Sequence, residues 1–107
     1  MSGSGGSGYG SGFGQGNSCE NLVIDTQLSS PVAAVIGQLV IGSVLTVGTQ
    51  PGQVTTLVVA IYNGQVAGGL ASAQIARLLE CIDSGHQYKA TVTSINDAQI
   101  KVRVEAA

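Results

Sequence analysis

Few residues of this chain have side chains that could carry out catalysis or bind a metal ion. The sequence contains one histidine, His86, and two cysteines, Cys19 and Cys81. A general base needs a nucleophile and an orienting group beside it, and a metal site needs several ligands. The sequence has no C-x-x-C, and its carboxylates are scattered: Glu20, Asp25, Glu80, Asp83, Asp97 and Glu105. We therefore predict a protein that is not an enzyme and that uses no metal or cofactor.

The histidine and the cysteines also have ordinary structural interpretations. His86 follows Gly85, just past the expected end of a helix, where an imidazole commonly hydrogen-bonds free carbonyls. Cys81 lies on the flank of that helix and is expected to pack as a small apolar side chain. Cys19 could be an exposed thiol or a packing residue, and a Cys19–Cys81 disulfide stays open as an alternative. Two cysteines without a signal peptide favour a reduced, cytoplasmic protein.

The charge of the chain argues against some classes of partner. Its 107 residues carry six acidic and four basic side chains, which gives a net charge of −2 at pH 7. Strong binding of nucleic acid normally requires many lysines and arginines. No apolar run approaches the roughly 18 residues of a membrane span. We expect one domain without membrane association.

The first eighteen residues, Met1–Ser18, differ from the rest in composition. They hold eight of the sixteen glycines and no charge, so they have too little apolar surface to offset the entropy of ordering. We predict a disordered Gly/Ser-rich tail at 1–18 and a domain at 19–107. The G-x-G-x-x-G of this tail lacks the strand and helix that a dinucleotide site needs. Tyr9 and Phe13 could mediate weak self-association, or the tail could be a plain spacer.

The domain is predicted to alternate strands with two helices. Strands are expected in three runs of β-branched and aliphatic residues, at 21–28, 41–47 and 54–62. Ser30 and Pro31 resemble the N-cap and first residue of a short helix between the first two strands. A second helix is expected from Ser72 to about Ser84.

Two hairpins complete the predicted fold. Asn63-Gly64 predicts a two-residue turn that pairs Tyr62 with Gln65 and Ile61 with Val66. In the last hairpin the apolar side chains share one face only if pairs such as Val92–Val102 form, which predicts a three-residue loop around Asn96-Asp97. The fold class is therefore mainly β with one or two short helices (α+β), as a small, partly open SH3-like or OB-like barrel.

The outer face of the last hairpin is the candidate binding face. It carries Lys89, Thr91, Lys101 and Arg103, which include three of the four basic residues of the chain. Such a face could hold phosphates or an acidic partner, although an ordinary solvated sheet face has the same composition. Tyr62 is added as a residue that could stack a base.

Several motifs of the second half follow the pattern of one family. They are Val58–Gly64, Val66–Leu70, Ile75–Leu79 and Gly85–Val92. Over residues 54–95 the chain thereby resembles the HIRAN domain, a small barrel attached to some DNA-repair and helicase proteins. The resemblance implies an SH3/OB-like barrel that binds single-stranded DNA ends. The chain departs from the family at 49–53, where an acidic, Asn/Pro-rich run is expected. The Gly-rich head also resembles that of a set of small bacterial proteins.

Two functions follow from these observations. The first is a non-catalytic protein-interaction or accessory module that uses the barrel surface or an open strand edge. Low charge and high aliphatic content favour it. The second, the alternative, is HIRAN-like binding of single-stranded DNA through the basic face. The sequence does not identify a protein partner.

Overall fold

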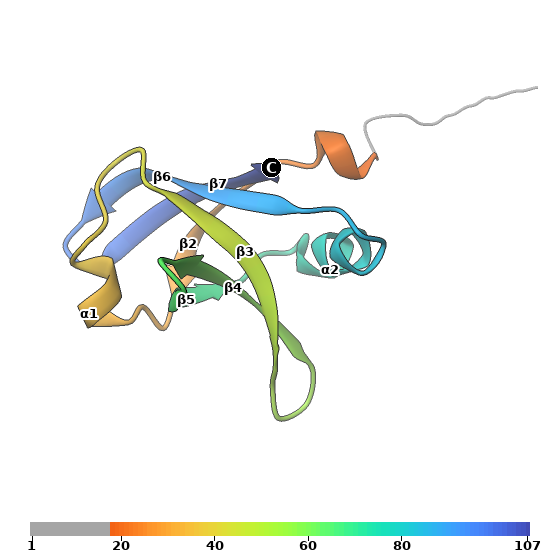
Figure 1. Cartoon of the computed structure of the whole chain (residues 1–107), viewed down its shortest axis with the longest axis horizontal. Helices are drawn as coiled ribbons and strands as arrows, with labels where there is room; N and C mark the ends of the chain where they lie inside the picture. Colours follow the sequence, from red (N-terminus) through yellow and green to blue (C-terminus); the bar gives the residue numbers. More distant parts are fainter. Residues whose placement is uncertain (1–17) are drawn as a thin grey trace, which may run out of the picture.

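The computed structural model describes residues 18–107 (Figure 1). The predictions for the tail, with Tyr9, Phe13 and the glycine motif, fall on residues 1–17 and lie outside the described residues. The elements are, in order, η2 (Cys19–Asn21), β2 (Ile24–Ser29), α1 (Ala33–Ile36), β3 (Val44–Pro51), β4 (Thr56–Tyr62), β5 (Gln65–Leu70), α2 (Ile75–Asp83), β6 (Tyr88–Asn96) and β7 (Gln99–Ala106). The predicted mainly β fold with two short helices is confirmed.

The six strands of residues 18–107 form one antiparallel barrel in the order β2-β5-β4-β3-β6-β7, which closes because β7 also pairs with β2. The seams differ greatly in length. The β2–β5 seam consists only of the pairs Leu28–Leu70 and Ser29–Gly69, so few backbone hydrogen bonds close the barrel there. Gly69 permits this close approach, because a Cβ at that position would lie 2.7 Å from Ser29 Oγ.

Alternate residues of the strands fill the barrel. The largest fully buried side chains include Ile24, Leu45, Leu78, Val92, Ile100, Val102 and Val104. Tyr88 is also buried, and its hydroxyl donates a hydrogen bond of 2.6 Å to the Cys19 carbonyl. This burial raises the pKa of the Tyr88 phenol.

The β4–β5 hairpin has the predicted register. Tyr62 pairs with Gln65, and Ile61 pairs with Val66. Asn63 and Gly64 both have positive φ, 51° and 79°, as a type I′ turn requires.

The β6–β7 hairpin has the predicted pair Val92–Val102 but not the predicted three-residue loop. Asn96 pairs with Gln99, so the loop has two residues, and Asp97 adopts a φ of 56°. The register shifts between Val92 and Ser94, which makes Thr93 the extra residue of a β-bulge. The prediction that Val92 pairs with Val102 was therefore correct, but the extra residue that this pairing requires lies in a bulge within β6 and not in the loop.

The first helix begins later than predicted, at Ala33. Ser30 is not its N-cap: it has a φ of 46°, and the helix begins at Ala33. The reason is that the Val32 N–H donates to the Ala67 carbonyl of β5 at 2.8 Å, which holds the preceding segment against the barrel. Val35 and Leu39 are buried, whereas Val32 is exposed.

The predicted end of the second strand and the predicted start of the third strand were also wrong. β3 does not end at 47 but continues to Pro51, and β4 begins at Thr56 rather than at Val54. The predicted strands 41–47 and 54–62 left residues 48–53, which include Pro51, as a connection. A proline is tolerated at that position because Pro51 lies on an edge of the hairpin, where its missing N–H is not needed.

The second helix ends as predicted and is joined to the N-terminal segment by a disulfide. Gly85, with a φ of 100°, donates to the Ile82 carbonyl while His86 N–H donates to the Cys81 carbonyl, a Schellman motif. Cys19 and Cys81, whose Cα atoms lie 5.6 Å apart, form the disulfide that the sequence left open.

Within residues 18–107, no helix has the length and apolar character needed to cross a membrane.

Candidate interaction surfaces

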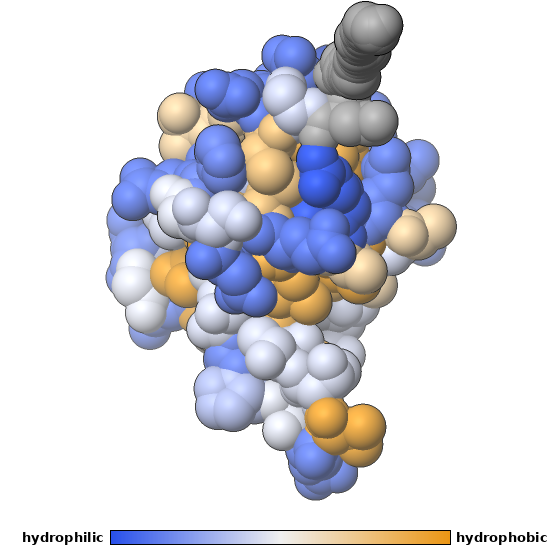
Figure 2. All heavy atoms as spheres, turned by 90° about the vertical axis from the view of Figure 1, so that its right-hand side faces the viewer, coloured by the Kyte–Doolittle hydropathy of each residue, from blue (hydrophilic) through white to orange (hydrophobic). Residues whose placement is uncertain are grey.

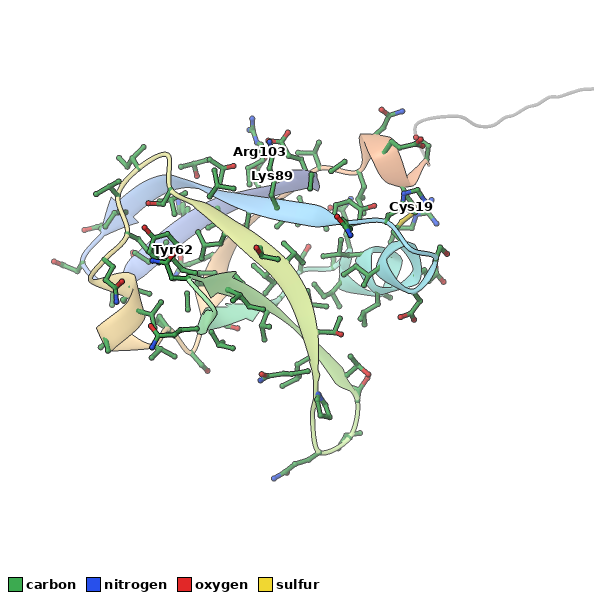
Figure 3. All side chains as sticks on the ribbon, in the orientation of Figure 1. Cys19, Tyr62, Lys89 and Arg103 are labelled. Atoms are coloured by element: carbon green, nitrogen blue, oxygen red, sulfur yellow. A yellow bond between two sulfur atoms is a disulfide. The ribbon has the colours of Figure 1, made fainter. Side chains whose placement is uncertain are left out.

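The predicted basic face lies on neighbouring strands, with one exception. Lys89 and Thr91 on β6 and Lys101 and Arg103 on β7 alternate with core residues and therefore point outward. Lys89 and Arg103 lie on the same side of the molecule in Figure 3. Tyr62 does not join them: it lies at the end of β4, away from both, and packs against the core.

Carboxylates neutralise much of this face. Arg103 Nε and Nη2 donate to Asp25 Oδ1 and Oδ2 of β2 at 2.9 and 3.3 Å, a bidentate pair. The hydrogen bond from Arg103 lowers the pKa of Asp25, and Asp25 in turn raises the pKa of Arg103. Glu105 of β7 lies directly opposite Lys89 of β6 in the strand register. Three cations and two carboxylates leave the face with a net charge of only +1.

A shallow groove of 330 Å³ lies on the same face beside the Thr93 bulge. It is lined by Asp25, Thr26, Gln27, Thr93, Lys101 and Val102. The lining pairs one carboxylate with one amine, so its charge favours neither anions nor cations.

All charged residues of the chain lie before residue 26 or after residue 76. The segment between Asp25 and Arg77 contains no Asp, Glu, Lys, Arg or His over 51 residues, 26–76. It forms most of β2 and all of α1, β3, β4 and β5. We call the surface of residues 28–76 the uncharged side, and the surface of residues 19–27 and 77–107 the charged side. Eight large apolar side chains are exposed between residues 18 and 107, and six of them lie on the uncharged side: Val32, Val40, Ile41, Val44, Val54 and Leu57.

A groove of 450 Å³ runs along the outside of β4 and β5 on the uncharged side. Leu57, which is 44% exposed, and Val32 stand at its margins, and Val59 and the backbone of Gly68 and Gly69 lie deeper. The other lining residues are uncharged: Ser29, Ser30, Gln50, Val58, Val66, Leu70 and Ala71. We call it the uncharged groove. Its volume is within the range of small-molecule pockets, and its lining suits an apolar group.

β3 and β4 continue beyond the barrel as a two-stranded ribbon, residues 47–58. β3 pairs with β6 only from Val44 to Thr46, and β4 pairs with β5 only from Val59 onward. Figure 2 shows the ribbon extending from the body, with few strongly hydrophilic side chains and a hydrophobic group near its far end. Val54, in the connecting turn, is 98% exposed.

The candidate catalytic residues are not gathered in a site. Both cysteines are in the disulfide, so neither is a free thiol. None of the grooves described above is lined by His86. Residues 18–107 contain no group of three His, Cys, Asp or Glu side chains placed to hold a metal ion.

Comparison with known proteins gives no relative from which to assign a function. No family model matches the chain, and no match was found among curated proteins or among solved structures. The HIRAN-like resemblance therefore stays a prediction.

The sequence contained a signal that our prediction did not use. The 51-residue segment without charge is visible in the residues alone, and it maps onto one side of the barrel only because α1 and β3 to β5 are consecutive in the chain. The Asp25–Arg103 pair had no such signal, since 78 positions separate the two residues.

Proposed function

We propose that this chain is a non-catalytic protein-interaction module, an accessory subunit, that docks on its partner through the uncharged side. One observation carries the proposal: the uncharged groove and six exposed apolar side chains are formed by a continuous segment that contains no charged residue. The centres of protein interfaces are depleted in charged residues, because a buried charge without a partner is costly. The uncharged side can be covered without that penalty.

The partner that fits this surface is a protein segment that presents an apolar side chain. Leu57, Val59 and Val66 supply apolar contacts in the groove, while Ser29 and Gln50 can hydrogen-bond the backbone of the segment. A charged or phosphorylated segment would lose hydration there without gaining a counterion.

The alternative, HIRAN-like binding of single-stranded DNA ends, rests on Lys89, Lys101 and Arg103 sharing one outer face. The carboxylates of Asp25 and Glu105 on that face weigh against it. The predicted cytoplasmic location also stays a prediction. The Cys19–Cys81 disulfide weighs against it, because structural disulfides persist mainly in oxidising compartments.

The test is affinity capture by the tagged full chain, with two variants of matched exposure. Leu57→Asp places a carboxylate at the uncharged groove, and Val23→Asp changes an apolar residue of 46% exposure on the charged side. We expect a partner captured by the wild type to be retained by Val23→Asp and reduced about tenfold or more by Leu57→Asp. Equal capture by all three proteins would refute docking through the groove.

A titration with a short single-stranded DNA distinguishes the alternative. The proposed function predicts an affinity no better than about millimolar at physiological salt. Tighter, salt-dependent binding that charge reversal at Lys101 and Arg103 abolishes would instead establish the basic face as the functional surface.

A further inference from the structure

In the ribbon, the edge of β3 that faces away from β4 has backbone groups that are not paired with another strand of residues 18–107. On the side of β3 away from β4, pairing with β6 ends at Thr46, and no strand among residues 18–107 pairs with Val47–Pro51 there. The chain thus has a closed barrel but a free edge where β3 leaves it. Free edges in native proteins are normally protected by charged side chains or bulges. An edge without this protection pairs readily with other strands.

Two hydrogen bonds establish which backbone groups face this edge. Gly52 N–H donates to the Thr55 carbonyl at 3.0 Å across the ribbon, and Val92 N–H donates to the Ser43 carbonyl at 2.9 Å on the opposite side of β3. Hydrogen-bonding direction alternates along an antiparallel strand, so even-numbered residues of β3 face β4 and odd-numbered residues face away. The N–H and C=O of Thr49 therefore point outward, away from β4.

The edge lacks the usual protection. The ribbon has no charged residue, and β3 is paired with β4 without a bulge from Thr46 to Pro51. Pro51 is the only protective residue, and it limits an added strand to a few residues. Val54 at the tip and Val44 on the adjoining outer face are exposed and apolar.

We propose that the occupant of this edge is a second copy of the chain, whose β3 adds antiparallel to the first across a two-fold axis. The edge is complementary to itself: with Thr49 opposite Thr49 of the other copy, each N–H meets the other C=O, and Gly48 lies opposite Gln50. Because neither ribbon carries charge, no like charges meet in the pair. The contact is short, so the dimer is weak and reversible. The inference concerns the same uncharged side as the proposed function, but it uses the backbone edge of β3, whereas the uncharged groove uses side chains that include Gln50, Leu57 and Val58 of the ribbon.

Sedimentation velocity of the full chain at about 10 µM to about 1 mM tests the pairing. We expect the weight-average mass to rise from 10.7 kDa toward twice that value. Thr49→Pro removes the outward N–H of the β3 edge and should remain monomeric. Thr56→Pro is the matched control: by the same alternation it removes an outward N–H from the β4 edge, and it should dimerise like the wild type.

Amide hydrogen exchange supplies a readout that does not depend on a variant that folds. The Thr49 amide should exchange more slowly at high than at low protein concentration, while the Gln50 amide, already bonded to β4, should change little. A wild type that is monomeric throughout, or a folded Thr49→Pro protein that dimerises normally, would overturn the proposal. Neither outcome affects the groove, which the Leu57→Asp capture experiment tests separately.

Discussion

The charged and uncharged sides belong to one barrel, yet they leave different surfaces exposed. On the charged side, outward positions of β6, β7 and β2 carry ions that pair with one another, such as Arg103 with Asp25. On the uncharged side, the outward positions of β3 and β4 carry Val44, Thr46, Gln50 and Leu57. Hydrated charges need no partner, whereas exposed apolar groups are stabilised when another surface covers them. The difference indicates which side is available for docking.

The two sides also differ in how they are held together. The charged side has the Cys19–Cys81 disulfide, which joins η2 to α2, and the long β6–β7 seam. The uncharged side has the two-pair β2–β5 seam and the ribbon. The shortest seam of the barrel therefore lies on the side that carries most of the exposed apolar side chains.

The largest expected effect comes from removing the disulfide. Replacing both cysteines by alanine should lower the free energy of unfolding by about 4 kcal/mol, from the loss of a cross-link that closes 62 positions of chain. Urea denaturation of the two proteins measures the difference. A loss below about 1 kcal/mol would show that the segment around Cys19 contributes little to the fold.

An intermediate effect compares two neighbours on β3. Leu45 is 0% exposed and Val44 is 56% exposed. Leu45→Ala should cost about 3 kcal/mol because it leaves a cavity in the core, whereas Val44→Ala should cost less than about 0.5 kcal/mol. Thermal unfolding of the variants tests the pair. A large cost for Val44→Ala would mean that this residue supports the monomer and is not a free surface.

The smallest effect concerns the Asp25–Arg103 ion pair. The pKa of Asp25 lies below its ordinary value of 3.8, so the folded state binds that proton less readily than the unfolded state. The pair thus contributes its stability above pH 3.8 and loses it as the pH falls through the lower, folded pKa. Because both side chains are exposed, we expect Asp25→Asn to change stability only slightly at pH 7. An NMR titration of the Asp25 carboxyl that gives a pKa at or above its ordinary value would contradict this pair.

Local patterns predicted the elements of the fold well. Asn63-Gly64 specified a turn and its register, and Gly85 specified a helix end, because each depends on backbone preferences of adjacent residues. The bulge at Thr93 could not be placed, since the sequence requires an odd residue but does not say where it lies. Likewise, the first helix was predicted to start at Ser30 and Pro31, because the sequence does not show that Val32 N–H bonds to the carbonyl of Ala67, 35 positions away.

The candidate surface was predicted only in part. Lys89, Lys101 and Arg103 share a face because all three lie on one hairpin with alternating side chains. The pairing of Asp25 with Arg103 could not be predicted in this way, because it depends on the contact between β2 and β7, which lie at the two ends of the domain. The closure of the barrel, and hence the ribbon that projects from it, also depends on such distant pairings.

Amide hydrogen exchange on the chain, free and bound to the partner that it captures, tests docking through the uncharged side most directly. The account predicts new protection in Ser29–Val32 and in β4 and β5, around the uncharged groove, with no change on β6 and β7. Protection confined to the outward face of β6, β7 and β2 would contradict it.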